Sequence, residues 1–193
     1  MTNTTLIKLV ILTIALSSSV FGQNGKVQTS IKKSAQLPQS IVVIRIKDDG
    51  ATSELPLVPI AASPKLRSAK LGAMYFGPQS ESDISIILEL QGTKSRYRTD
   101  NTFGVRLSSN GIQLKNDKLR IVTAIDNIPG GDRLHFYITT EELSWLANSR
   151  ALVIESMNAD SGEILDAFTF TVPSLKEFKK FAESVLMIMS TYN

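Results

Sequence analysis

Residues 133–190 constrain the fold more than any other stretch, because strand patterns and helix starts alternate there. Apolar and polar residues alternate over 134–138, which predicts a strand with one buried face. Two more strands are predicted over 151–157 and 163–172, separated by a turn rich in Asn, Asp and Gly. One helix start follows the first strand and another follows the last, so the helices must cover a sheet.

The first helix start is a capping box formed by Thr139 and Glu142. In this motif the hydroxyl accepts a hydrogen bond from a first-turn amide, and the carboxylate accepts one from the cap amide. Ile138 and Leu143 flank the cap at the spacing of a hydrophobic staple. These signals predict a short helix at about 140–149.

The second helix start has Pro173 ahead of Ser174, with Glu177 three residues after the serine. We therefore predict a Ser174 cap and an amphipathic helix over about 175–190. Its apolar stripe consists of Leu175, Phe178, Phe181, Ala182, Val185, Leu186, Ile188 and Met189. Met187 is predicted to lie on the opposite side, and the helix is too short and too polar to cross a bilayer.

The residues before 133 add further strand patterns, at 41–47, 83–91, 103–114 and 119–125. Prolines predict that 55–63 is an edge strand or an extended loop, and 65–76 fits neither period. The predicted fold class is therefore α+β. We expect a mainly antiparallel sheet or sandwich, with one short helix and one C-terminal amphipathic helix.

Residues 1–22 have the pattern of a secretory signal peptide, with an apolar run behind one lysine. We predict cleavage between Gly22 and Gln23, which would leave no stable membrane span. Residues 23–38 lack periodicity and are interpreted as a flexible lead. Residues 39–193 then form a single globular β-rich domain, and the protein is expected to be secreted or periplasmic.

The composition excludes several kinds of chemistry, because the chain has no cysteine and one histidine. Thiol catalysis, disulfides and cysteine-type zinc sites are excluded, and one imidazole cannot build a histidine-based metal site. The net charge of +3 at pH 7 demands no acidic partner. Lys94, Arg96, Tyr97 and Arg98 form a basic cluster, but acidic residues lie near it in the sequence. We predict a mixed surface there and no nucleic-acid partner.

Trp145 is the first candidate binding residue, because the predicted short helix has a better buried face without it. Exposed indoles are often used at interfaces. Tyr137 and His135 are near enough in the sequence to complete a small recognition patch with Trp145. The alternative interpretation is that Trp145 covers the edge of the sheet or a loop.

Two acidic loops carry the oxygen ligands that calcium prefers. They contain Asp126, Asn127 and Asp132 in one loop, and Asn158, Asp160 and Glu163 in the other. Neither loop matches the spacing of an EF-hand. Asn, Asp and Gly are also typical of tight turns for backbone reasons, which is the alternative interpretation of both loops. No cofactor other than calcium is predicted.

The order of the elements around the segments FYITTEELSWLANSRALVIES and FTFTV resembles that of a loose group of small uncharacterised exported bacterial proteins. In that group a β-rich body ends in a strand, helix, strand, strand, helix unit. The resemblance covers residues 83–190 and rests on the pattern alone. It implies a fold class and no activity.

The favoured function is an exported non-catalytic module that binds a protein or a cell-envelope component. A binding module is preferred to an enzyme because the sequence contains neither a nucleophile elbow nor a histidine-based metal site. The alternative is a hydrolase or a calcium-dependent glycan-binding protein that uses the acidic loops. Two carboxylates brought face to face by the fold would favour that alternative.

Overall fold

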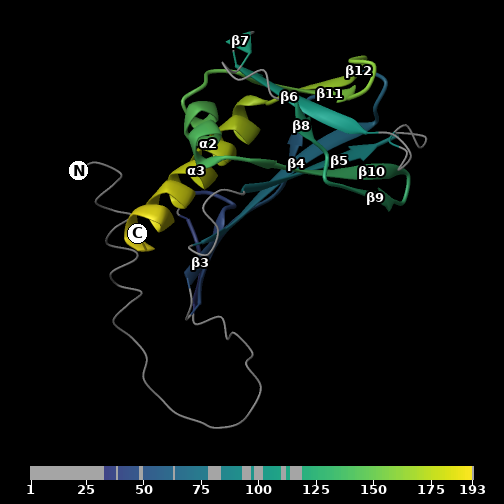
Figure 1. Ribbon diagram of the computed structural model, residues 1–193. Helices are drawn as coiled ribbons and strands as arrows, with labels where there is room; N and C mark the ends of the chain where they lie inside the picture. The colour runs from purple at the N-terminus through teal and green to yellow at the C-terminus, as the bar shows by residue number, and fades with distance from the viewer. Residues whose placement is uncertain are drawn as a thin grey trace, which may run out of the picture.

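The computed structural model describes residues 33–37, 39–47, 50–62, 64–77, 84–92, 97, 102–109, 112–113 and 119–192. These residues form two antiparallel β-sheets and two helices (Figure 1). The α+β prediction, with a mainly antiparallel sheet, a short helix and a C-terminal helix, is confirmed. The predicted signal peptide and its cleavage site lie outside the described residues.

The larger sheet, sheet A, has seven strands in the order β1-β2-β3-β4-β5-β10-β9. They are β1 (Lys33–Gln36), β2 (Val43–Lys47), β3 (Gly50–Ile60), β4 (Ser68–Gly77), β5 (Ile84–Gln91), β9 (Ala124–Ile128) and β10 (Gly131–Ile138). The segment 65–76, which fitted neither period, thus contains most of β4. Because β1 pairs with β2, at least Lys33–Gln36 of the predicted flexible lead 23–38 belongs to the sheet.

The smaller sheet, sheet B, has the order β12-β11-β6-β7, and β8 also pairs with β6. Its strands are β6 (Phe103–Ser109), β7 (Ile112–Gln113), β8 (Arg120–Ile121), β11 (Leu152–Asn158) and β12 (Ile164–Thr169). The single strand predicted over 119–125 is wrong, because the chain crosses from sheet B to sheet A between β8 and β9. The Val122 amide donates to the Phe103 carbonyl at 2.9 Å, and the Thr123 amide donates to the His135 carbonyl at 2.8 Å.

β3 has strands on both sides only in its first half, and residues 55–60 pair with β4 alone, as predicted for an edge strand from the prolines. β2 pairs only with Gly50–Glu54, so Pro56 and Pro59 lie in the half of β3 that pairs with β4 alone. A bulge between Leu55 and Val58 takes up the first proline. A proline is tolerated in a strand where its missing N–H faces an unpaired edge or a bulge.

The short helix, α2 (Thr140–Ala147), begins with the predicted capping box. The Glu142 amide donates to the Thr139 hydroxyl at 3.2 Å, and the Thr139 amide donates to the Glu142 carboxylate at 2.9 Å. Leu143 and Leu146 are the buried residues of this helix. Both the cap and the apolar face predicted for α2 are confirmed.

The long helix, α3 (Val172–Tyr192), begins earlier than predicted. The Ser174 amide donates to the Thr171 hydroxyl at 3.3 Å, and the Leu175 amide donates to the Thr171 carbonyl at 2.9 Å. Thr171 is therefore the cap, and the predicted Ser174 cap is wrong. Pro173 falls in the first turn, where its missing N–H breaks no helical hydrogen bond. Among the described residues, no helix is long and apolar enough to cross a membrane.

Most of the apolar stripe predicted for α3 is buried or packs against the core, but one edge of the buried side differs from the prediction. Leu186, predicted to be buried, is 41% exposed, whereas Met187, predicted to face away, is partly buried against the core. Ser184 takes an inward position instead, because its hydroxyl bonds to the Ser53 hydroxyl of β3 and to the Phe181 carbonyl. A helical wheel treats only apolar residues as inward. It therefore misplaces the buried side of a helix where a serine with satisfied hydrogen bonds is buried.

The core lies between the two sheets and against the helices. Figure 1 shows β6, β11 and β12 above β4, β5 and β10, with α2 and α3 side by side at one end. A small apolar cavity is lined by both sheets and both helices: Leu71 and Phe136 from sheet A, Leu107 and Ile154 from sheet B, Leu146 from α2 and Phe178 from α3. One face of sheet A is therefore covered by the core, and its other face points away from it.

Candidate functional site

The candidate site is the face of sheet A that points away from the core, which we call the outer face. The inward side chains of β10 are all buried: Leu134, Phe136 and Ile138. Arg133, His135 and Tyr137 alternate with them and therefore lie on the outer face. The position of any other side chain on this face follows from the register of its strand with β10.

Four charged residues from four neighbouring strands form a row across the outer face, which we call the charge row. They are Lys70 of β4, Glu89 of β5, Arg133 of β10 and Asp126 of β9, and each lies opposite the next in the strand register. The Glu89 carboxylate bridges two cations, at 3.7 Å from the Lys70 Nζ and 2.8 Å from an Arg133 guanidinium nitrogen. The signs of the row therefore alternate: positive, negative, positive, negative.

Glu89 is only 8% exposed, although it lies on the outer face. The two cations beside it compensate for that burial, since charge-assisted hydrogen bonds are stronger than neutral ones. At the other end of the row, Asp126 lies 2.8 Å from the His135 Nε2. The imidazole is thus held against the charge row.

Apolar side chains lie next to the charge row on the outer face, and we call them the apolar band. They are Leu57 of β3, Met74 and Phe76 of β4, Ile87 of β5 and Tyr137 of β10. Phe76 is 52% exposed, Tyr137 45% and Leu57 36%. Gly72 makes room for the band, because a Cβ at this position would lie 3.3 Å from the Leu57 Cδ2.

An apolar centre beside a charged rim is the usual anatomy of a protein-binding surface. Single exposed apolar residues are ordinary on any soluble protein. Leu57, Phe76 and Tyr137 differ from that case because three separate strands of one sheet bring them to the same face. Exposed apolar side chains grouped on one face of a sheet favour an interaction site there.

The predicted recognition patch is brought together only in part. His135 and Tyr137 are two positions apart on β10 and share the outer face. Trp145 belongs to α2, whose Leu143 and Leu146 point into the core, and its indole is partly buried against that core. Trp145 therefore packs partly against the core, and its part in a recognition patch stays a prediction.

The first predicted calcium loop does not converge on one point. Asp126 lies opposite Arg133 on the outer face, whereas Asn127 lies opposite Asp132 on the other side of the sheet. Asp132 is buried, and its Oδ2 has no hydrogen-bond partner. Because successive strand residues point to opposite faces, the Asp126 and Asp132 carboxylates cannot share an ion.

The second predicted calcium loop is a tight turn between β11 and β12. The Asn158 Oδ1 accepts hydrogen bonds from the amides of Asp160 and Ser161, both at 2.9 Å. This is the backbone role that Asn has in an Asx turn. In the part of the chain that the structure describes, no three or more His, Asp or Glu side chains are grouped so as to hold a metal ion.

Tyr97, the aromatic member of the predicted basic cluster, is buried. Its hydroxyl lies 2.6 Å from the Ser156 hydroxyl and donates to the Asp166 carboxylate at 3.1 Å. The other members, Lys94, Arg96 and Arg98, lie outside the described residues. Tyr97 therefore belongs to the core and not to an exposed cluster. No local signal in the sequence indicated this, because Ser156 and Asp166 are far from Tyr97 in the chain.

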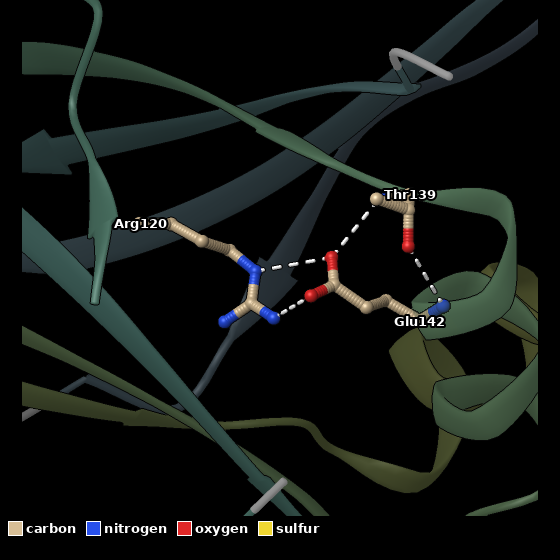
Figure 2. A network of polar contacts seen from close by, with 3 residues as sticks. All are labelled: Arg120, Thr139 and Glu142. Atoms are coloured by element: carbon tan, nitrogen blue, oxygen red, sulfur yellow. Dashed lines mark hydrogen bonds and ion pairs between the residues drawn. The ribbon is translucent and has the colours of Figure 1, made fainter. Parts of the chain in front are cut away.

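A polar network that no sequence motif indicated joins β8 to the start of α2 (Figure 2). The Arg120 guanidinium group binds both carboxylate oxygens of Glu142, one of them through Nε at 3.1 Å. The same carboxylate accepts from the Thr139 amide. The Arg120 side chain is 9% exposed, and its burial lowers the pKa of the guanidinium group. This network holds a helix start in place and does not face the outer surface of sheet A.

Comparisons with known proteins leave the outer face as the main guide to function. No protein-family model matches the chain, and no curated protein or solved structure matches it either. The resemblance to small exported bacterial proteins therefore stays a prediction.

Proposed function

We propose that this chain is an exported, non-catalytic module that binds a protein of the cell envelope through the outer face of sheet A. The observation that carries the proposal is the apolar band, in which Phe76, Tyr137 and Leu57 are exposed on the same face of sheet A as the charge row. The proposal that the protein is exported rests on the signal-peptide pattern of residues 1–22.

The energetics of such a face favour binding. Apolar surface removed from water contributes roughly 25 cal/mol per Å², and aromatic side chains supply the largest areas. Phe76 and Tyr137 are fixed on strands in the interior of a seven-stranded sheet, so little conformational entropy remains to be lost when a partner binds. The charge row adds orientation, because charges at the rim of an interface select the partner and its register.

The environment of His135 supports binding over hydrolysis. Its Nε2 is occupied by Asp126, whose side chain is mostly exposed to water. Enzymes usually place such a pair in a site that excludes water, because electrostatic interactions are stronger there. At the outer face the pair acts as part of a solvated rim.

Capture from a solubilised cell-envelope fraction tests the proposed face. The immobilised domain is compared with a double variant, Phe76→Ser with Tyr137→Ser, that removes both exposed aromatic rings of the apolar band. A matched control, Ile121→Ser with Leu186→Ser, removes two exposed apolar side chains from β8 and α3 instead. We expect the first variant to lose a captured protein that the wild type and the control retain. Equal capture by all three proteins would contradict the proposal.

Mass spectrometry of the protein from its own cells tests export separately. We expect a mature chain that begins at Gln23. A chain that keeps residues 1–22 and is extracted with membranes would show that the segment is an anchor.

A further inference from the structure

We infer that the protein bound by the outer face is a second copy of this chain, so that two copies pair face to face about a two-fold axis. The inference rests on the proposed function, because the same face does the binding. It is drawn from the order of charges in the charge row and from the position of the apolar band beside it.

The charge row is complementary to its own reverse. From β4 to β9 it runs Lys70, Glu89, Arg133, Asp126. A two-fold axis that is parallel to the strands and passes between β5 and β10 lays each row against the reversed row of the other copy. Lys70 then faces Asp126 of the second copy, and Glu89 faces Arg133 of the second copy. Every contact in the paired rows joins opposite charges, because the first and fourth residues of the row differ in sign and so do the second and third.

The same axis covers part of the apolar band. It carries Tyr137 of each copy over Ser85 of β5 in the other copy, and His135 over Ile87, because these residues lie opposite one another in the register. An axis parallel to the strands also keeps the strand directions of the two copies aligned, which is the common way for two sheets to pack face to face. Tyr137 and Ile87 of the apolar band are thus covered, while the charge row sets the register.

Pairing through the edge of sheet A is disfavoured by comparison. β9 is the edge strand next to β10, and Asp126 is its middle residue. Antiparallel pairing of two β9 strands about their centres would place Asp126 opposite Asp126 of the second copy, and like charges directly opposite are destabilising. Self-association through the β9 edge is therefore disfavoured, and we assign it to the outer face.

Sedimentation velocity of the purified mature chain, alone and as charge variants, tests this arrangement. We expect the wild type to dimerise with a dissociation constant at or below about 100 μM. Lys70→Glu places a carboxylate against Asp126 of the second copy at both ends of the interface. Asp126→Lys places two cations together in the same way. Each variant alone should dimerise at least about tenfold more weakly, because two attractive pairs become repulsive.

A mixture of the two variants is the decisive measurement. In a mixed dimer the changed residues face each other as Glu and Lys, and the unchanged Asp126 of one copy faces the unchanged Lys70 of the other. The mixture should therefore dimerise about as tightly as the wild type. Effects of either change within its own sheet would not be repaired by mixing, so recovery identifies the two-fold contact.

Several outcomes would overturn the inference. They are a wild type that stays monomeric at every concentration, single variants that dimerise like the wild type, and a mixture that stays as weak as its components. Circular dichroism checks that each variant is folded. Should one of them be unfolded, Tyr137→Arg replaces it, because a cation in the apolar band must also weaken the dimer. A monomeric chain that still captures an envelope protein through Phe76 and Tyr137 would refute the self-pairing and leave the proposed function standing.

Discussion

The two helices are attached to the body of the protein in different ways. α2 has eight residues, buries Leu143 and Leu146, and is held at its start by the capping box and by Arg120. α3 has 21 residues and buries a long series of side chains: Ser174, Phe178, Phe181, Ala182, Ser184, Val185 and Ile188. A helix of two turns cannot bury enough surface to be stable, so polar contacts at its start become decisive, whereas a long helix is stabilised by burial along its length.

Polar contacts of α3 serve a different purpose. The Glu177 carboxylate accepts from the Ile41 amide at 3.0 Å, and the Lys180 Nζ donates to the Gln39 carbonyl at 2.7 Å. These bonds fasten the chain before β2 to the middle of the helix and leave the helix start to Thr171. Removing a buried side chain from α3 and removing the Glu142 contacts at the start of α2, which we call the clamp, should therefore have separate effects on stability.

The largest expected effect comes from removing burial in α3. Phe181 is fully buried, and Phe181→Ala should lower the free energy of unfolding by about 3–5 kcal/mol, because transfer energy and a residual cavity both contribute. Equilibrium unfolding in guanidinium chloride gives this value. A loss below about 1 kcal/mol would mean that α3 is not stabilised mainly by its buried side.

The next effect comes from breaking the clamp on α2. Glu142→Ala removes the acceptor of the Thr139 amide and leaves the poorly exposed Arg120 guanidinium without this carboxylate. We expect a loss of about 2–3 kcal/mol in the same titration. Glu141→Ala is the matched control, since Glu141 is exposed in the same turn, and it should change stability by at most about 0.5 kcal/mol. Equal losses from both variants would show that the network contributes nothing specific.

A smaller effect is expected at the start of α3. Thr171→Ala removes the hydroxyl that accepts from the Ser174 amide and should cost about 1 kcal/mol. Thr171→Ser keeps an equivalent hydroxyl and should restore most of the loss. Thermal unfolding of the two variants distinguishes them. If the serine variant is no better than alanine, Thr171 is not the functional cap.

The smallest effect is expected on the exposed side of α3. Leu186→Lys should change stability by no more than about 0.5 kcal/mol, because Leu186 is largely exposed. Met187→Lys should cost about 1 kcal/mol or more, because Met187 packs partly against the core. Unfolding titrations of the two neighbours give a direct comparison. The reverse ranking would restore the helix orientation predicted from the apolar stripe.

Local signals in the sequence were sufficient for some of these features. Thr139 and Glu142 are three residues apart, so their reciprocal hydrogen bonds depend on little besides the helix that they begin. The alternation in β10 likewise predicted which side chains are buried. The same reasoning placed the cap of α3 at Ser174 and left Thr171 in the strand, because the position of the cap depends on where β12 ends and α3 turns onto the sheet.

The candidate site was only partly predictable. His135 and Tyr137 were identified because they occupy the polar side of an alternating strand. Phe76 and Leu57 were not, because β4 lacked a clean period and the prolines of β3 indicated an edge or a loop. Trp145 was assigned to the surface because a wheel cannot show that a large indole beside a buried face reaches the core from its flank.

The sequence by itself determined the types of element, the capped start of α2 and the inward face of β10, since each depends on residues a few positions apart. The tertiary structure decided which strands are neighbours. Lys70, Glu89, Arg133 and Asp126 form a row only because β10 pairs with the distant strand β5 as well as with its chain neighbour β9. Arg120 reaches Glu142 only because β8 joins sheet B. Long-range pairing of this kind is selected by burial of the whole sheet, and no local pattern in the chain encodes it.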